Sequence, residues 1–75
     1  MAETFKTTGE LFAIIEEHRE KQGMSQRDLS QRAGLSHASY WFAANRGGEL
    51  NVSSAIAYAD VLDLDLQVIK KRARK

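Results

Sequence analysis

Hydrogen-bonding and cationic side chains gather in one stretch of this 75-residue chain, between Met24 and Gly47. Three arginines stand there against a single acidic residue, Asp28. Two short helix patterns divide the stretch, and a tight turn at residues 33–36 separates them. Two helices joined in this way form a helix-turn-helix, a motif that docks on duplex DNA. The chemistry expected of these residues is therefore hydrogen bonding and charge pairing with DNA.

Catalysis and metal binding both lack the residues that they need. Ser36 and His37 are neighbours in sequence, so on a helix their side chains point in different directions, and no positioned acid accompanies them. Two histidines without any cysteine make no recognisable metal site. His18 falls on the apolar face of the first expected helix, where we expect a half-buried packing residue. We expect neither an enzyme nor a cofactor.

The charge distribution says more than the net charge of +1. Five of the eleven basic residues lie in a C-terminal tail at 70–75, so residues 1–69 carry six basic and ten acidic groups, a net charge of −4. A generally basic DNA-binding surface is therefore not expected, and the positive charge is confined to one mildly basic face. The tail is either a solvated end or an arm that adds nonspecific phosphate contacts.

The length allows one small domain, spanning residues 1–75, because a chain of this size buries only about 60% of its unfolded surface. Without cysteine no disulfide can form, which fits a reducing cytoplasm. No apolar run approaches the roughly 18 residues that a membrane span needs. We expect a cytoplasmic protein with no membrane partner.

The absence of proline and the scarcity of β-branched runs predict an all-helical fold. Capping residues and glycines predict five helices, at about residues 7–23, 25–34 and 36–45, from 51 or 53 to 63, and from 65 onward. The fourth helix is expected to bury an apolar stripe made of Val52, Ala55, Ile56, Ala59 and Leu62. The fifth, capped by Asp65, is expected to turn Leu66 and Ile69 inward.

An arginine late in the first helix is followed by a glycine, a Ser-Gln pair, an inward leucine and a Gly-Leu-Ser turn: Arg19, Gly23, Ser25–Gln26, Leu29 and residues 34–36. In this pattern, without gaps over roughly residues 10–70, the chain resembles the Cro/CI-type (XRE) helix-turn-helix family of phage and bacterial repressors. The resemblance implies a lambda-repressor-like five-helix domain, with the helix-turn-helix at about 25–46. Three departures alter helix boundaries and the loop after the third helix: Ala44 replaces glutamate, Arg46 glycine and Leu50 proline.

The resemblance also implies how the motif meets DNA. The third helix, about 36–45, would lie in the major groove, with Tyr40 pointing into the core. The side-chain amide of Gln26 would then meet a phosphate, and His37 would take the place of a base-reading glutamine. Trp41 and Phe42 would lie on or beside the DNA face, where apolar contact favours thymine methyl groups. The expected DNA-contacting residues are Gln26, Arg27, Ser36, His37, Ala38, Ser39, Trp41, Phe42, Asn45 and Arg46.

A regulator of this kind is expected to bind double-stranded DNA as a homodimer on a two-fold symmetric operator, because one small domain buries little DNA. Analogy with the family places it on a mobile element. A second interpretation stays open, because aromatic side chains at helical spacing are more often core or interface than DNA contacts. In it the same fold binds a protein through Trp41 and Phe42, as an anti-activator or an antitoxin does.

Overall fold

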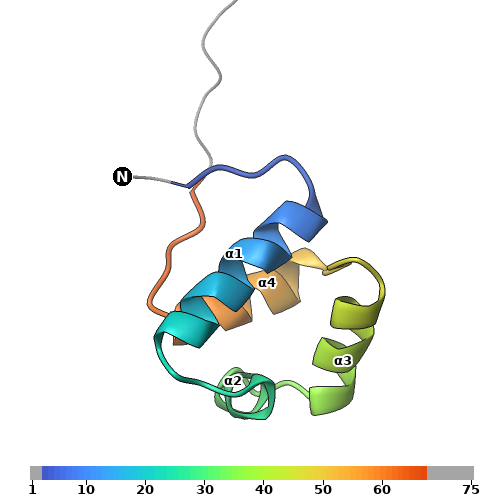
Figure 1. Cartoon of the computed structure of the whole chain (residues 1–75), viewed down its shortest axis with the longest axis vertical. Coiled ribbons are helices and arrows are strands. Elements are labelled where there is room, and N and C mark those ends of the chain that lie inside the picture. Colours follow the sequence, from blue (N-terminus) through green and yellow to red (C-terminus); the bar gives the residue numbers. More distant parts are fainter. Residues whose placement is uncertain (1–2, 68–75) are drawn as a thin grey trace, which may run out of the picture.

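The computed structural model describes residues 3–67, and this part of the chain is all-helical. Its four helices are α1 (Thr8–Lys21), α2 (Gln26–Arg32), α3 (His37–Asn45) and α4 (Val52–Val61). α1 and α4 pack against each other, and α2 contacts both α3 and α4 (Figure 1). The predicted all-helical fold is confirmed for these residues. None of their helices has the length and apolar character needed to span a bilayer.

Each helix begins next to a side chain that caps it. The side-chain oxygens of Thr7, Ser25, Ser36 and Asn51 accept the backbone N–H three residues further on, at 2.8 to 3.1 Å. The side-chain carboxylate of Asp28 in turn accepts a hydrogen bond from the backbone N–H of Ser25, which completes a capping box at α2. The first N–H groups of a helix have no partner inside it, so these short-range bonds determine where each helix starts.

The core is shared by all four helices. Its centre is Tyr40, which is fully buried and packs its ring against Phe12 of α1 and Tyr58 of α4, with centroids 5.2 and 5.1 Å apart. The buried hydrophobic residues of this cluster are Leu11, Phe12, Ile15, Leu29, Tyr40, Ala43, Ala55, Tyr58 and Leu62. Because α3 contributes Tyr40 and Ala43, one face of that helix is committed to the core and the other is left outside.

The predicted apolar stripe of α4 is wrong at two positions. Val52 is 73% exposed and Ile56 is 53% exposed, whereas Tyr58 is buried. The stripe that packs is Ala55, Tyr58, Ala59 and Leu62, which also follows helical spacing. The aromatic contact with Tyr40 explains the difference, because the large ring of Tyr58 reaches the centre of the core only when the helix turns Ile56 toward solvent.

The predicted fifth helix does not begin at Asp65 within the described residues. Two residues after α4, Asp63 lies in the left-handed region at a φ of 63°, and the backbone N–H of Leu64 bonds to the carbonyl of Ala59 at 2.8 Å. From Leu64 to Gln67 the chain has no regular secondary structure. Leu66, expected to face inward, is 37% exposed. The other expected inward residue, Ile69, lies outside the described residues.

The loop between α3 and α4 touches the start of α1 through two glycines. A Cβ atom on Gly48 would lie 2.9 Å from the Cα of Gly9 and 2.8 Å from the Cβ of Phe12. Gly48 also has a φ of 84°, in the region that side chains disfavour. This close approach packs the loop after α3 against the first turns of α1.

Candidate nucleic-acid interface

The turn between α2 and α3 has the geometry of a helix-turn-helix. After α2 the backbone N–H of Leu35 bonds to the carbonyl of Ser30 at 2.9 Å, and Gly34 takes a φ of 74°. A left-handed residue at this point ends the helix and redirects the chain, and glycine adopts it without steric cost. Figure 1 shows the result, with α2 viewed nearly end-on and α3 lying beside it in the plane of the picture. Ser36 then caps α3 directly, so the connection is only a few residues long.

The structure leaves all ten predicted DNA-contacting residues at the surface. Gln26 and His37 are half-buried, and the others are exposed: Arg27, Ser36, Ala38, Ser39, Trp41, Phe42, Asn45 and Arg46. They belong to α2, to α3 and to the residues that cap α3. The motif therefore brings the whole predicted set onto two neighbouring helices.

Two aromatic rings dominate the outer face of α3. Trp41 is 52% exposed and Phe42 is 49% exposed, and their rings pack edge to face with centroids 5.4 Å apart. The guanidinium of Arg46 lies 5.3 Å from the centre of the Phe42 ring. The expectation that Tyr40 points inward is confirmed, since Tyr40 is fully buried. We call Trp41, Phe42 and Arg46 the aromatic face; it offers apolar contact, one indole N–H and one cation.

The polar groups of α3 are partly engaged within the protein. The hydroxyls of Ser36 and Ser39 lie 2.9 Å apart, and Asn45 donates from Nδ2 to the carbonyl of Trp41 at 2.8 Å. The Nδ1 atom of His37 is buried and has no hydrogen-bond partner among residues 3–67. A partner outside the protein would therefore meet the other ring nitrogen, Nε2. Through that one nitrogen His37 can either donate or accept a hydrogen bond, depending on its tautomer.

Positive charge on this side of the molecule is not cancelled by ion pairs. Within the described part of the chain, the salt bridges involve His18, Arg19 and Lys21, all on α1. No salt bridge there engages the three arginines of the stretch around the motif, Arg27, Arg32 and Arg46, which are exposed. Unpaired surface cations of this kind are what an anionic backbone attracts.

A polar cluster that the sequence does not predict joins α1 to the motif. The carboxylate of Glu16 on α1 accepts bonds from Nε and Nη2 of Arg19 at 2.9 and 3.1 Å, and from Nε2 of Gln26 at 3.4 Å. The hydroxyl of Tyr40 donates to the same carboxylate. Arg19 also donates to the carbonyl of Met24 at 2.6 Å. This Glu16 cluster ties α1 to both helices of the motif, and only the three-residue spacing of Glu16 and Arg19 hinted at it.

The cluster changes the acidity of its members. Burial alone would raise the pKa of Glu16, but the hydrogen bonds from Arg19 and Tyr40 outweigh burial, so this pKa lies below its ordinary value. Burial and the bond to Glu16 raise the pKa of Tyr40, so its hydroxyl stays protonated as a donor. The hydrogen bond to Glu16 raises the pKa of Arg19. At neutral pH the cluster is an ionised carboxylate surrounded by donors.

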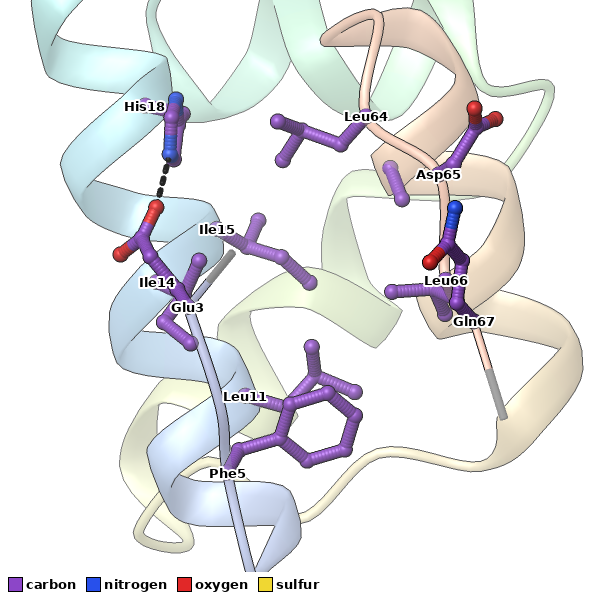
Figure 2. A pocket seen from close by; sticks show the side chains of 11 residues that line it. Glu3, Phe5, Leu11, Ile14, Ile15, His18, Leu64, Asp65, Leu66 and Gln67 are labelled. Carbon is purple, nitrogen blue, oxygen red and sulfur yellow. Dashed lines mark hydrogen bonds and ion pairs between the residues drawn. The ribbon is translucent and has the colours of Figure 1, made fainter. Parts of the chain in front are cut away.

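A groove of about 310 Å³ is lined by residues outside α2 and α3. Figure 2 shows Phe5 and Leu11 at one end of it and Leu64 and Leu66 on the opposite wall. His18, expected to be a half-buried packing residue, lines this groove with 24% of its side chain exposed, and its Nε2 lies 2.7 Å from a carboxylate oxygen of Glu3. The described residues contain no cluster of His, Asp or Glu that could hold a metal ion.

Two short helices, α2 and α3, are joined by a tight turn, the outer face of α3 is exposed, and the arginines of the stretch are not engaged in salt bridges within residues 3–67. These features define a helix-turn-helix protein. Residues 15–69 match the family model described as helix-turn-helix. The chain belongs to this family, the Cro/CI or XRE type of helix-turn-helix domain, whose members are DNA-binding regulators. A comparison with curated proteins found no significant match.

Proposed function

We propose that this chain is a sequence-specific transcriptional regulator of the Cro/repressor type, which places α3 in the major groove of DNA. The observation that carries the proposal is the division of α3 into two faces. Tyr40 and Ala43 are buried, whereas Trp41 and Phe42 are about half exposed. The major groove is about 12 Å wide and admits a helix, so the outer face of α3 would meet base edges.

The ten residues of the interface take two kinds of role in this proposal. His37, Ala38, Trp41 and Phe42 meet bases, because they occupy the first turns of α3. The remaining residues contact the sugar-phosphate backbone, which fixes the register of the protein on the duplex: Gln26, Arg27, Ser36, Ser39, Asn45 and Arg46. Accordingly, Gln26→Ala should weaken all duplexes alike, whereas His37→Ala should relax the preference at one base position.

We further propose that the aromatic face selects thymine. Trp41 and Phe42 have large apolar surfaces and little hydrogen-bonding capacity, and the thymine methyl is the apolar group that the major groove displays. Burying one methyl group is worth about 0.8 kcal/mol, which is roughly a fourfold gain in affinity.

Replacing thymine by uracil tests the thymine proposal directly, because the two bases differ only in that methyl group. Two DNA duplexes would be titrated at equal salt, one of alternating adenine and thymine and one with deoxyuridine at every thymidine position. The anisotropy of a dye on the DNA is the signal. The thymine duplex should bind more tightly, and Trp41→Ala or Phe42→Ala should bring the ratio toward one. Ile56→Ala is the matched control, since it truncates a half-exposed apolar side chain on α4. Equal affinity of the unaltered chain for both duplexes would contradict the proposal.

We also propose that two copies bind a two-fold symmetric operator, with half-sites about 34 Å apart. The small size of the motif supports this, because one module buries too little DNA for useful affinity. Phe5 and Leu64, which line the groove of Figure 2, are candidate dimer residues away from α2 and α3. Sedimentation of the chain with and without a palindromic duplex measures the stoichiometry, and one chain per palindrome would contradict the dimer.

A second candidate function is supported by the same aromatic face. Exposed aromatic pairs also anchor protein–protein interfaces, so Trp41 and Phe42 could hold a protein partner, as in an anti-activator or an antitoxin. Salt separates the two functions. About six phosphate contacts predict that log affinity falls with log salt at a slope of roughly −5, whereas apolar protein contacts depend little on salt. If no duplex binds better than random DNA at physiological salt, the regulator proposal fails.

Family analogy extends the proposal to the setting of the regulator, a bacterial or phage cytoplasm and a mobile element. The genes beside the coding sequence test this extension. A divergent promoter with a second small regulator would support a Cro-like switch, and an adjacent toxin gene would support the antitoxin function.

A further inference from the structure

The side-chain amide of Gln26 is held by a residue outside the helix-turn-helix. Its Nε2 atom lies 3.4 Å from Oε1 of Glu16, which is on α1. Glu16 is itself fixed in place by two bonds from Arg19 and one from the hydroxyl of Tyr40. Only 24% of the Glu16 side chain is exposed. Gln26 therefore rests against an anchored carboxylate rather than in open solvent.

We propose that Glu16 is a positioning residue that fixes the orientation of the Gln26 amide for a DNA phosphate. An ionised carboxylate only accepts hydrogen bonds, so it must face the nitrogen of the amide and not its oxygen. One N–H of Nε2 is then taken by Glu16, and the second N–H is left for another acceptor. A phosphate oxygen is also an acceptor, so the amide is held with a donor available to it. This inference rests on the proposed DNA-binding function.

The sign of the change in DNA affinity distinguishes a positioning role of Glu16 from a simple effect of its charge. A carboxylate near DNA repels phosphates, so removing its charge should strengthen binding if charge alone mattered. In the structure the bidentate pair with Arg19 offsets that repulsion while it keeps Glu16 an acceptor. A positioning role predicts the opposite sign, namely weaker binding when Glu16 becomes glutamine. Glutamine offers both a donor and an acceptor, so it no longer excludes the flipped amide of residue 26.

The experiment is a double-mutant cycle on a mixed-sequence duplex, since a phosphate contact does not depend on sequence. Affinity is measured at low salt by the anisotropy of labelled DNA for the unaltered chain, Glu16→Gln, Gln26→Ala and the double variant. Glu20→Gln is the matched control, because it removes the same charge from α1, and among the described residues the Glu20 carboxylate accepts a hydrogen bond from Arg19, at 3.5 Å, and not from Gln26. Circular dichroism at the temperature of the titration measures the helical content of each variant.

We expect Glu16→Gln to lower affinity about fivefold to tenfold, comparable with Gln26→Ala, as the loss of one hydrogen bond of ordinary strength would do. In the Gln26→Ala background the same change should have no effect or strengthen binding slightly, as should Glu20→Gln. If Glu16→Gln strengthens binding while Gln26→Ala weakens it, the positioning role is wrong and the proposed function stands. If the unaltered chain binds no duplex, the proposed function fails, and this inference fails with it.

A measurement on the unaltered chain keeps the inference testable if Glu16→Gln does not fold. The two protons of the Gln26 side-chain amide give separate nuclear magnetic resonance signals. On addition of the duplex, the proton directed away from Glu16 should shift and the proton bonded to Glu16 should shift little. Equal shifts of both protons, or of neither, would overturn the inference.

Discussion

The hydroxyl of Tyr40 donates a hydrogen bond to the carboxylate of Glu16. The ring of the same residue is fully buried between Phe12 and Tyr58. One side chain thus joins the apolar core to the Glu16 cluster and sets the rotation of α3. The exposure of Trp41 and Phe42 follows, because they are the next residues on that helix.

We expect Tyr40→Phe to destabilise the fold by about 1.5 to 3 kcal/mol, the usual range for a hydrogen bond to a charged group. The packing of the ring is kept, so the loss of stability comes from the missing hydrogen bond. The carboxylate of Glu16 is then left with one donor fewer. Urea unfolding followed by far-ultraviolet circular dichroism measures it. In a Glu16→Gln background the same change should cost clearly less; an equal cost in both backgrounds would show that the hydroxyl does not act through the carboxylate.

Acid should destabilise the fold partly through Glu16. The pKa of this carboxyl is lowered in the folded state from an ordinary value of 4.5, so its stabilising contribution is fully present above that value. The contribution is lost as the pH falls through the lower, folded pKa, because the unfolded chain then binds the proton more readily. Urea midpoints across this range should fall less steeply for Glu16→Gln than for the unaltered chain. Parallel curves for the two proteins would contradict this assignment.

Two adjacent glycines provide a matched pair of stability tests. At Gly47 an added Cβ meets nothing within 4 Å, and the only penalty is a φ of 71°. We therefore expect Gly47→Ala to cost about 1 to 2 kcal/mol. Gly48→Ala has the same kind of backbone penalty and also drives a Cβ against Phe12 and Gly9, which adds about 1 to 3 kcal/mol. Thermal unfolding of both variants measures the difference, and equal melting temperatures would show that the loop moves away from α1 without cost.

Trp41→Ala should separate stability from binding. Because Trp41 is 52% exposed, its truncation removes about half of the surface that a core tryptophan buries, and we expect it to cost about 2 kcal/mol rather than the roughly 3 to 5 kcal/mol of a core position. Binding to a partner of the aromatic face should weaken by more than that. Thermal unfolding and a DNA titration on the same sample make the comparison. A large loss of stability would mean that the ring supports the fold.

Local signals explain most of what the sequence predicts correctly. The caps at Ser25 and Ser36 and the glycine of the turn act over three or four residues, so the pattern itself indicates where α2 and α3 begin. The burial of Tyr40 follows from the register of the motif. Once that residue points inward, helical geometry places Trp41 and Phe42 outside.

The errors come from contacts between distant segments. On α4 both Ile56 and Tyr58 fit an apolar stripe, and only the position of Tyr40 on another helix decides which of them is buried. The Glu16 cluster joins residues separated by 10 and 24 positions, so no periodicity indicates it. The end of α4 depends on Asp63 in a left-handed conformation, which sequence pattern rarely indicates for a residue other than glycine.

The position of Trp41 also has a consequence for spectroscopy. It is the only tryptophan of the chain, and it lies on the outer face of α3 rather than in the core. Its indole is already in contact with water in the folded state, so its emission should change little when the chain unfolds. The same indole should respond strongly when a duplex or a protein covers α3. Intrinsic tryptophan fluorescence should therefore report occupancy of the proposed interface on α3, without any attached dye.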